Sequence, residues 1–226
     1  LVFVLSVPVE QAIPMSLIVI AAAAAVGALP KVRVGQVQWR LAGVFTAVGI
    51  PATFIGSAIG QPLPQSVILV GFAAVMVIAG IRMLMDAADT GTACEVGDSD
   101  INWRRCAPRS IPAGIVVGVL TGLFGVGGGF LIVPALVLLL GVQMPIAIGT
   151  SLLVIVANSA AGALTYVSQS TIDWGMTALF AGTAVVASLI AGQIGTRLDT
   201  SRLQHWFAYL VFVVAAYVLI DTLILR

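Results

Sequence analysis

Residues 41–81 read LAGVFTAVGIPATFIGSAIGQPLPQSVILVGFAAVMVIAGI, a stretch of 41 residues without one charged side chain. A membrane-spanning helix needs about 20 mostly apolar residues, so this stretch is long enough for two of them. The segment Gly60-Gln61-Pro62-Leu63-Pro64 lies near its middle and is typical of a turn. The stretch therefore predicts two spanning helices joined by a short connection.

The rest of the chain has the same character. Further uncharged runs cover 11–30, 110–172 and 174–196. Of the 226 residues, 60% are hydrophobic and only 8% are charged, whereas soluble domains are about 25% charged. We therefore expect an all-α, polytopic membrane protein. The predicted spans are 11–29, 40–60, 66–86, 113–140, 146–167, 174–195 and 203–224.

The composition also excludes several functions. The net charge of +1 gives no basic bulk, so we expect no nucleic-acid partner. Two cysteines, Cys94 and Cys106, are too few for a disulfide framework, and the single histidine, His205, leaves little for a metal site. Ionisable residues that could converge on a reacting group are nearly absent from the spans. We therefore expect no enzyme activity, no catalytic residue, no metal and no cofactor.

The chain matches itself when it is shifted by 135 residues. Residues 1–91 then lie on 136–226 without a gap, and 28 of the 91 pairs are identical. Shared apolar composition explains some identities, but not two tryptophans and two helix-end aspartates in one register. The register predicts two tandem repeats, which in transporters place the substrate site between the halves. The most informative identical pairs are Ser16/Ser151, Gly27/Gly162, Trp39/Trp174, Gly60/Gly195 and Asp86/Asp221.

The repeat divides the chain into a first repeat, 1–91, a polar linker, 92–112, and a second repeat, 113–226. Residues 113–135 have no counterpart in the first repeat, so we expect one further helix before Leu1 that is missing from this sequence. Each repeat would then hold about four transmembrane helices. Four spans per repeat predict parallel halves, whereas inverted halves would need one segment in each that does not cross.

Lysine and arginine predict the orientation. If the predicted connections alternate between the two sides, eight basic residues share the side of the loop 87–112 and two lie on the other. Basic residues collect on the cytoplasmic side, so we expect this loop and the C-terminus in the cytoplasm, with the loop's two thiols reduced. The eight are Lys31, Arg33, Arg40, Arg82, Arg104, Arg105, Arg109 and Arg226; the two are Arg197 and Arg202.

The densest motif is a glycine cluster over residues 118–134, GVLTGLFGVGGGFLIVP. Glycine costs about 1 kcal/mol in a helix interior. For Gly118 and Gly122 we expect close helix packing, which small residues allow. For the later glycines we expect unwound backbone, whose exposed N–H groups can bind an anion without any positive side chain. The substrate-binding candidates from this motif are Gly125, Gly127, Gly128 and Gly129.

A second motif, PIAIGTSL, covers residues 145–152. Thr150 or Ser151 can cap a helix that starts at Leu152. That helix is short for a full span, so we expect 141–150 to dip into the membrane and the positive helix end to face an anion. Asn158 lies seven residues beyond Ser151 on the same helix face, where an interhelical hydrogen bond or a ligand contact would explain it. The candidates here are Gly149, Thr150, Ser151 and Asn158, with Ser16 from the first repeat.

In these motifs the chain resembles the sulfite exporter TauE/SafE family of membrane permeases. The resemblance rests on the cluster Gly122–Gly129, on Val133-Pro134, on Ala147-x-Gly149-Thr150-Ser151-Leu152 and on the duplication. It implies a bacterial-type inner-membrane transporter of two four-helix halves, with substrates among sulfite, sulfonates and related anions. The first glycine-rich helix of the family is the one missing here, and Met15 stands where the second repeat has a threonine.

We therefore expect a permease, a secondary transporter that moves a small sulfur-containing oxyanion. We expect no fully buried lysine or arginine in the predicted spans to pair with such an anion, which leaves backbone N–H groups and hydroxyls as donors. The expected partners are the anion and the lipid bilayer, and a homo-oligomer is possible. The alternatives are an anion channel, a membrane-embedded enzyme and an accessory subunit. A channel could use the same backbone groups to select an anion.

Overall fold

The structure of the chain is a computed structural model, which describes residues 9–85, 96–97, 100–101, 103–124, 129–167, 174–195 and 200–224. These residues form eight α-helices and one short antiparallel ribbon. The helices are α2 (Val9–Arg33), α3 (Trp39–Gly60), α4 (Gln65–Met85), α5 (Trp103–Phe124), α6 (Gly129–Leu140), α7 (Met144–Val167), α8 (Trp174–Gly195) and α9 (Thr200–Ile224). The ribbon pairs β1 (Val96–Gly97) with β2 (Asp100–Ile101).

The prediction of a polytopic helical membrane protein is confirmed. Six helices, α2, α3, α4, α5, α7 and α8, are long and apolar enough to cross a membrane. α9 holds a shorter apolar stretch, Gln204–Ile220. α6 has 12 residues and is therefore about 18 Å long, against about 30 Å for the hydrocarbon core. Its residues from Leu131 to Val137 are all buried, so protein covers this short helix where lipid would otherwise contact it.

The predicted span 113–140 is wrong, because two helices stand in its place. α5 ends at Phe124 and α6 begins at Gly129. Thr121 of α5 and Ile132 of α6 line the same cavity, so α6 turns back along α5. Three arginines before residue 110 kept the start of α5 out of the predicted span. Arginine is nevertheless tolerated at the end of a spanning helix, because its long side chain reaches the membrane surface.

The predicted dip over 141–150 is also wrong. α6 ends at Leu140, and the next residue, Gly141, has a φ of 65° in the left-handed region that glycine favours. α7 then begins at Met144, eight residues before the predicted start at Leu152. Pro145 stands in its first turn, where a missing N–H needs no helical partner. Thr150 and Ser151 consequently lie inside a continuous helix.

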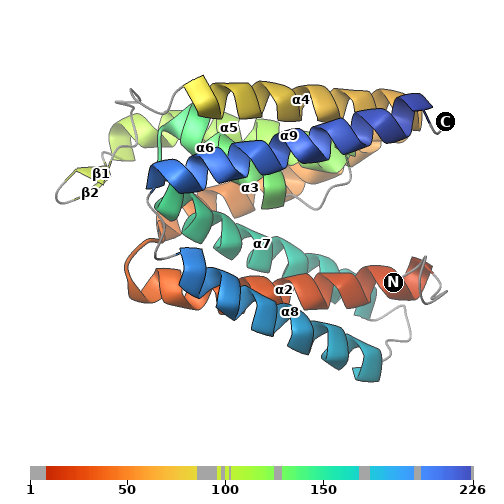
Figure 1. Cartoon of the computed structure of the whole chain (residues 1–226), viewed down its shortest axis with the longest axis horizontal. Coiled ribbons are helices and arrows are strands. Elements are labelled where there is room, and N and C mark those ends of the chain that lie inside the picture. The colour runs from red at the N-terminus through yellow and green to blue at the C-terminus, as the bar shows by residue number, and fades with distance from the viewer. Residues whose placement is uncertain are drawn as a thin grey trace.

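α7 is the central helix of the bundle (Figure 1). It contacts α2 on one side and α3, α6 and α9 on the other. α3 packs along α5 and α4 packs along α9, while α8 packs mainly on α2. α7 thus lies between the α2–α8 pair and α3, α6 and α9.

The two ends of the bundle differ in charge. α2 and α4 end, and α3, α5 and α9 begin, at the left end in Figure 1, which we call the basic end. Every basic residue whose backbone is described lies in a helix turn near this end. They are Lys31, Arg33, Arg40, Arg82, Arg104, Arg105, Arg109 and Arg202. Arg197 and Arg226 lie outside the described residues.

The expected common side for the loop 87–112 and the C-terminus is wrong. The Gln204 Nε2 group donates to Met83 O at 2.8 Å, so α9 starts beside the end of α4. α9 then runs to the opposite end of the bundle, where Ile224 lies (Figure 1). The error follows from the span 113–140, because one helix counted in place of two reverses every later segment.

Two buried side chains at the basic end also differ from expectation. Lys31 is only 7% exposed within α2, and its Nζ donates to Gln36 Oε1 at 3.0 Å, so one lysine is buried in a spanning helix. Cys106 is buried and disulfide-bonded, so the expected reduced thiol is wrong at this residue. Cys94 lies outside the described residues.

Candidate functional site

Two polar atoms inside the bundle have no hydrogen-bond partner. They are Thr121 Oγ1 on α5 and Asn158 Oδ1 on α7, and no other buried side-chain atom in the described part of the chain shares this state. Buried polar groups are nearly always paired, so each exception calls for an explanation such as a bound water or ligand. Hydroxyls in other helices donate to their own backbone, as Thr53 does to Gly49 O at 2.8 Å. Thr121 lacks even this bond.

Both unpartnered side chains line one small cavity of about 10 Å³, which is room for about one water molecule. Thr121 is 7% exposed, so its hydroxyl is well removed from solvent. The cavity therefore combines the two features of a buried binding position, space and unused polar atoms. The lining residues are Phe45, Gly49, Thr53, Gly114, Val117, Gly118, Thr121, Ile132, Val154 and Asn158.

The cavity lies deep within the spanning helices. Thr53 and Asn158 each stand 14 residues after the first residue of their helices, Trp39 in α3 and Met144 in α7. Both helices start at the basic end, so these side chains are about 21 Å from that end at 1.5 Å per residue. A ligand in the cavity would thus be inside the hydrocarbon region.

Close packing of α3 on α5 forms one wall of the cavity. A Cβ on Gly118 would lie 2.6 Å from Gly49 O, and one on Gly122 would collide with Thr53 O. A Cβ on Gly56 would collide with Val119 O in the same way. The expected packing role of Gly118 and Gly122 is confirmed. Because backbones touch here, Thr53 and Thr121 can approach the same space.

A helix N-terminus lies beside the cavity. α6 begins at Gly129, and its fourth residue, Ile132, is part of the lining. The first four N–H groups of a helix have no acceptor within it, and this end carries partial positive charge. The sequence predicted such a helix end at Thr150–Ser151, whereas the structure has one at Gly129.

The second predicted motif has other contacts. Thr150 Oγ1 accepts a hydrogen bond from the Gln38 N–H at 3.1 Å, next to the first residue of α3. Ser151 Oγ donates to Ile148 O at 2.9 Å within α7. A Cβ on Gly149 would collide with Gln36 O, so this glycine lets α7 approach the connection between α2 and α3. These three residues hold α7 against its neighbours at the basic end.

The predicted site residues are therefore not all brought together. Asn158 lines the cavity, and Gly129 starts the helix beside it. Ser16 is half-buried on α2 and is not part of the lining. Gly125, Gly127 and Gly128 lie outside the described residues.

Sequence reasoning missed Thr53 and Thr121 as lining residues. Both lie one helical turn from a glycine of the α3–α5 contact, Thr53 after Gly49 and Thr121 after Gly118. A hydroxyl spaced three or four residues from a packing glycine shares its helix face. This spacing is the feature of the sequence that could have identified the two threonines.

Comparison with known proteins identifies relatives that match most of the chain. The family model described as Sulfite exporter TauE/SafE matches residues 1–218. A probable membrane transporter protein of Xylella fastidiosa (strain 9a5c) is 34% identical over 191 residues, which cover 82% of this chain and 70% of the relative. The probable membrane transporter protein YunE of Bacillus subtilis (strain 168) is 25% identical over 200 residues, covering 84% and 72%. No solved structure matches the chain.

Proposed function

Since this chain belongs to the sulfite exporter TauE/SafE family and is a membrane transporter, we propose that it moves a small sulfur-containing oxyanion across the inner membrane. Sulfite or an organosulfonate is the proposed substrate. The bilayer and a small-molecule substrate follow from the family and the apolar helices. The anionic class rests on the chemistry of the cavity.

The cavity offers donors and no charge. Its described lining contains the hydroxyls of Thr53 and Thr121 and the amide of Asn158. The Thr53 hydrogen is donated to Gly49 O, so the Thr121 hydroxyl is the one that can donate to an oxyanion oxygen, whereas Asn158 Oδ1 can only accept. The N-terminus of α6 adds favourable charge. Hydrogen bonds to a charged group contribute about 1.5–3 kcal/mol each, so a few of them suffice for a transported ligand. The unpartnered Thr121 hydroxyl is the observation that supports this proposal most directly.

The size of the cavity favours a carrier over an open channel. About 10 Å³ is too little for an oxyanion, so the helices must move apart before one can enter. A channel conducts through a continuous path, whereas a carrier closes around its site between the two sides of the membrane. We therefore propose that the protein is a carrier, one that carries out no covalent chemistry on its substrate.

Reconstituted liposomes provide the test. The protein should catalyse saturable uptake of radiolabelled sulfite, and unlabelled sulfite loaded inside should accelerate uptake by counterflow. Sulfate, taurine and sulfoacetate, added as competitors, would rank the substrate class. Flux that rises linearly with concentration would indicate a channel, and the absence of sulfur-anion flux would contradict the proposed substrate.

We also propose that the basic end faces the cytoplasm, following the bias of basic residues. The disulfide at Cys106 argues for the other side, because disulfides persist outside the cytoplasm. Single cysteines introduced at Val34, exposed at the basic end, and at Leu63, exposed at the opposite end, separate the two orientations. In intact cells an impermeant thiol reagent should label Leu63→Cys and spare Val34→Cys; the reverse pattern would overturn the orientation.

A further inference from the structure

Asn158 Oδ1 and Thr121 Oγ1 differ in what each can offer a ligand. Both atoms are buried, belong to the lining of the same cavity and have no hydrogen-bond partner. An amide oxygen only accepts hydrogen bonds, whereas a hydroxyl can donate one. The third polar side chain of the lining, Thr53, already donates its hydrogen to Gly49 O at 2.8 Å. The cavity therefore presents one unused acceptor on α7 and one unused donor on α5.

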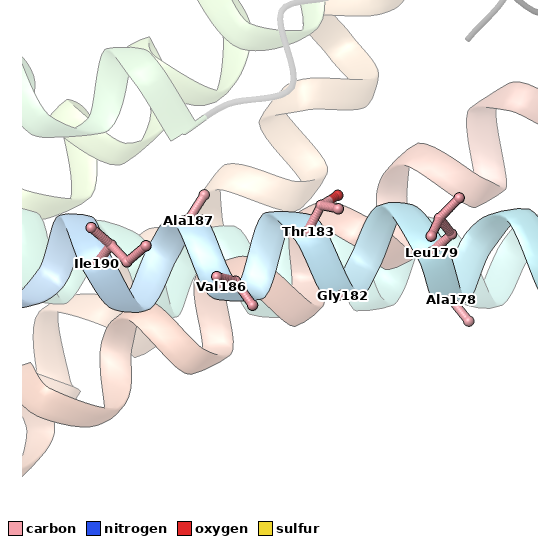
Figure 2. A pocket seen from close by; sticks show the side chains of 7 residues that line it. All are labelled: Ala178, Leu179, Gly182, Thr183, Val186, Ala187 and Ile190. Atoms are coloured by element: carbon pink, nitrogen blue, oxygen red, sulfur yellow. The ribbon is translucent and has the colours of Figure 1, made fainter.

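A second hollow, along α8, lacks such a pair (Figure 2). Its volume is about 560 Å³, and Thr183 is the one residue with a polar side chain among its described lining. Thr183 Oγ1 already donates to Phe180 O at 3.0 Å. Unused polar atoms, rather than volume, therefore distinguish the cavity between α5 and α7 as a place where an anion can bind.

The unpaired acceptor limits which anions fit the cavity. An anion whose oxygens carry no hydrogen brings its lone pairs against those of Asn158 Oδ1, so this oxygen stays unpaired in the complex. A buried polar group that stays unpaired costs binding free energy. A site that pairs with an O–H of its substrate rejects an analogue without that group for the same reason. Asn158 therefore favours a ligand that brings a hydrogen-bond donor of its own.

The lining also limits the charge of the ligand. None of its described side chains ionises, since they are aliphatic, aromatic, hydroxyl or amide groups. Charge that leaves water without a partner is costly, and a second negative charge adds to that cost. The N-terminus of α6 supplies only about half an elementary positive charge. The cavity is therefore better suited to a monoanion than to a dianion.

We propose that the protein carries hydrogen sulfite, the protonated monoanion, in preference to the sulfite dianion, an inference that rests on the proposed transport of a sulfur oxyanion. In hydrogen sulfite, HO–SO2⁻, one oxygen carries a hydrogen and the other two share the negative charge. The O–H donates to Asn158 Oδ1, and a charged oxygen accepts from Thr121 Oγ1. One ligand then satisfies both unpartnered atoms.

The two contacts join separate walls of the cavity. Thr121 belongs to α5, which packs along α3, and Asn158 belongs to α7. Hydrogen sulfite bound to both atoms holds α7 to the α3–α5 pair, whereas an anion without a donor is held by Thr121 alone. The proton on the substrate therefore decides whether the site can close around it.

Inhibition by methanesulfinate, CH3–SO2⁻, tests this preference in liposomes. This monoanion has the shape of hydrogen sulfite with a methyl group in place of the hydroxyl. Uptake of radiolabelled sulfite is measured at a pH below the second ionisation of sulfurous acid, where hydrogen sulfite is the main form. Half-inhibition should need at least about tenfold more methanesulfinate than unlabelled sulfite, because the methyl group leaves Asn158 Oδ1 unpaired. Equal inhibition by the two anions would overturn the proposal.

Two variants show which contact produces the preference. Asn158→Ala removes the acceptor and leaves the space, so the difference between the two anions should shrink to about twofold or less. Thr121→Val removes the donor to an oxygen that both anions possess, so both should bind more weakly and the difference should remain. A difference that persists in Asn158→Ala would overturn the assignment of the substrate proton to this residue.

A pH series tests the same inference without a substitution. At a fixed, low total concentration of sulfite, initial uptake should rise in proportion to hydrogen sulfite as the pH falls. Protein-free liposomes correct for diffusion of sulfur dioxide, and the inhibition constant of methanesulfinate, whose charge stays the same, controls for titration of the protein. Uptake in proportion to the dianion would overturn this inference and leave sulfite transport intact. No sulfite uptake at any pH would contradict the proposed substrate itself.

Discussion

α7 carries polar side chains at two levels, and their surroundings differ. Thr150 and Ser151, near the basic end, have hydrogen bonds to Gln38 N–H and Ile148 O. Asn158, two turns deeper, has a carbonyl oxygen without a partner and lines a cavity. The first pair therefore contributes to structure, whereas the deeper amide is available to a ligand. The hydrogen bonds of polar residues on one helix therefore distinguish structural residues from those available to a ligand. Their spacing in the sequence does not make this distinction.

Replacing Asn158 should have the largest effect on transport. Asn158→Leu removes the amide and fills the cavity, so sulfite uptake into liposomes should fall at least about 100-fold, the loss of roughly 2.8 kcal/mol of binding. Thermal unfolding in detergent should occur at the same temperature or higher, because an unpaired buried polar atom is removed. Wild-type uptake by a normally inserted variant would contradict the role of this cavity.

Thr121→Val should weaken substrate binding without changing the fold. Valine keeps the shape of threonine and removes the hydroxyl that has no protein partner. Loss of one donor should raise the half-saturating sulfite concentration about tenfold, or about 1.4 kcal/mol. Thr183→Val is the control, since Thr183 is exposed on α8 and donates to Phe180 O. Equal half-saturation for both variants and the wild type would exclude Thr121 from the site.

Thr150→Val should lower the stability of the protein and leave transport unchanged, the reverse of what we expect for Thr121→Val. The variant leaves the Gln38 N–H at the start of α3 without its side-chain acceptor, so stability should fall by about 1 kcal/mol. Uptake per folded molecule should remain at the wild-type level. A clear fall in the affinity for sulfite would show that the basic end belongs to the binding site after all.

Ser151→Ala should have the smallest effect. Its hydroxyl donates to a carbonyl of its own helix, and alanine is the better helix former. Unfolding temperature and half-saturating sulfite concentration should both stay close to wild type, with changes below about 0.5 kcal/mol. A tenfold loss of affinity would return Ser151 to the list of ligand contacts.

Hydrophobic content predicted the spanning helices well, because the bilayer demands long uncharged segments. The turn at residues 60–64 and the start of α8 at Trp174 were both recovered closely. The α5–α6 pair was not, since Arg104 and Arg109 hid the start of α5 and a half-length helix leaves no signal of its own in hydropathy. That single error also reversed the side assigned to the C-terminus.

The site was predicted only in part, because hydrogen-bond partners come from distant residues. Nothing local to Thr150 shows that its oxygen receives the N–H of Gln38, 112 positions away. Of the predicted residues, Asn158 lines the cavity and Gly129 starts α6 beside it, while Thr121 emerged only through the contact of α5 with α3. The predicted helix end at Thr150–Ser151 lies inside the continuous helix α7, and the helix N-terminus beside the cavity is that of α6.

The glycine contacts between α3 and α5 have a mechanical consequence. A Cβ at Gly56 or Gly122 would strike a backbone carbonyl, so the two helix backbones are in direct contact and we expect α3 and α5 to move together. The walls that bear Thr53 and Thr121 would then keep their separation while the other helices move. Any gate to the cavity must open on the remaining walls, where Ile132 of α6 and Val154 of α7 stand.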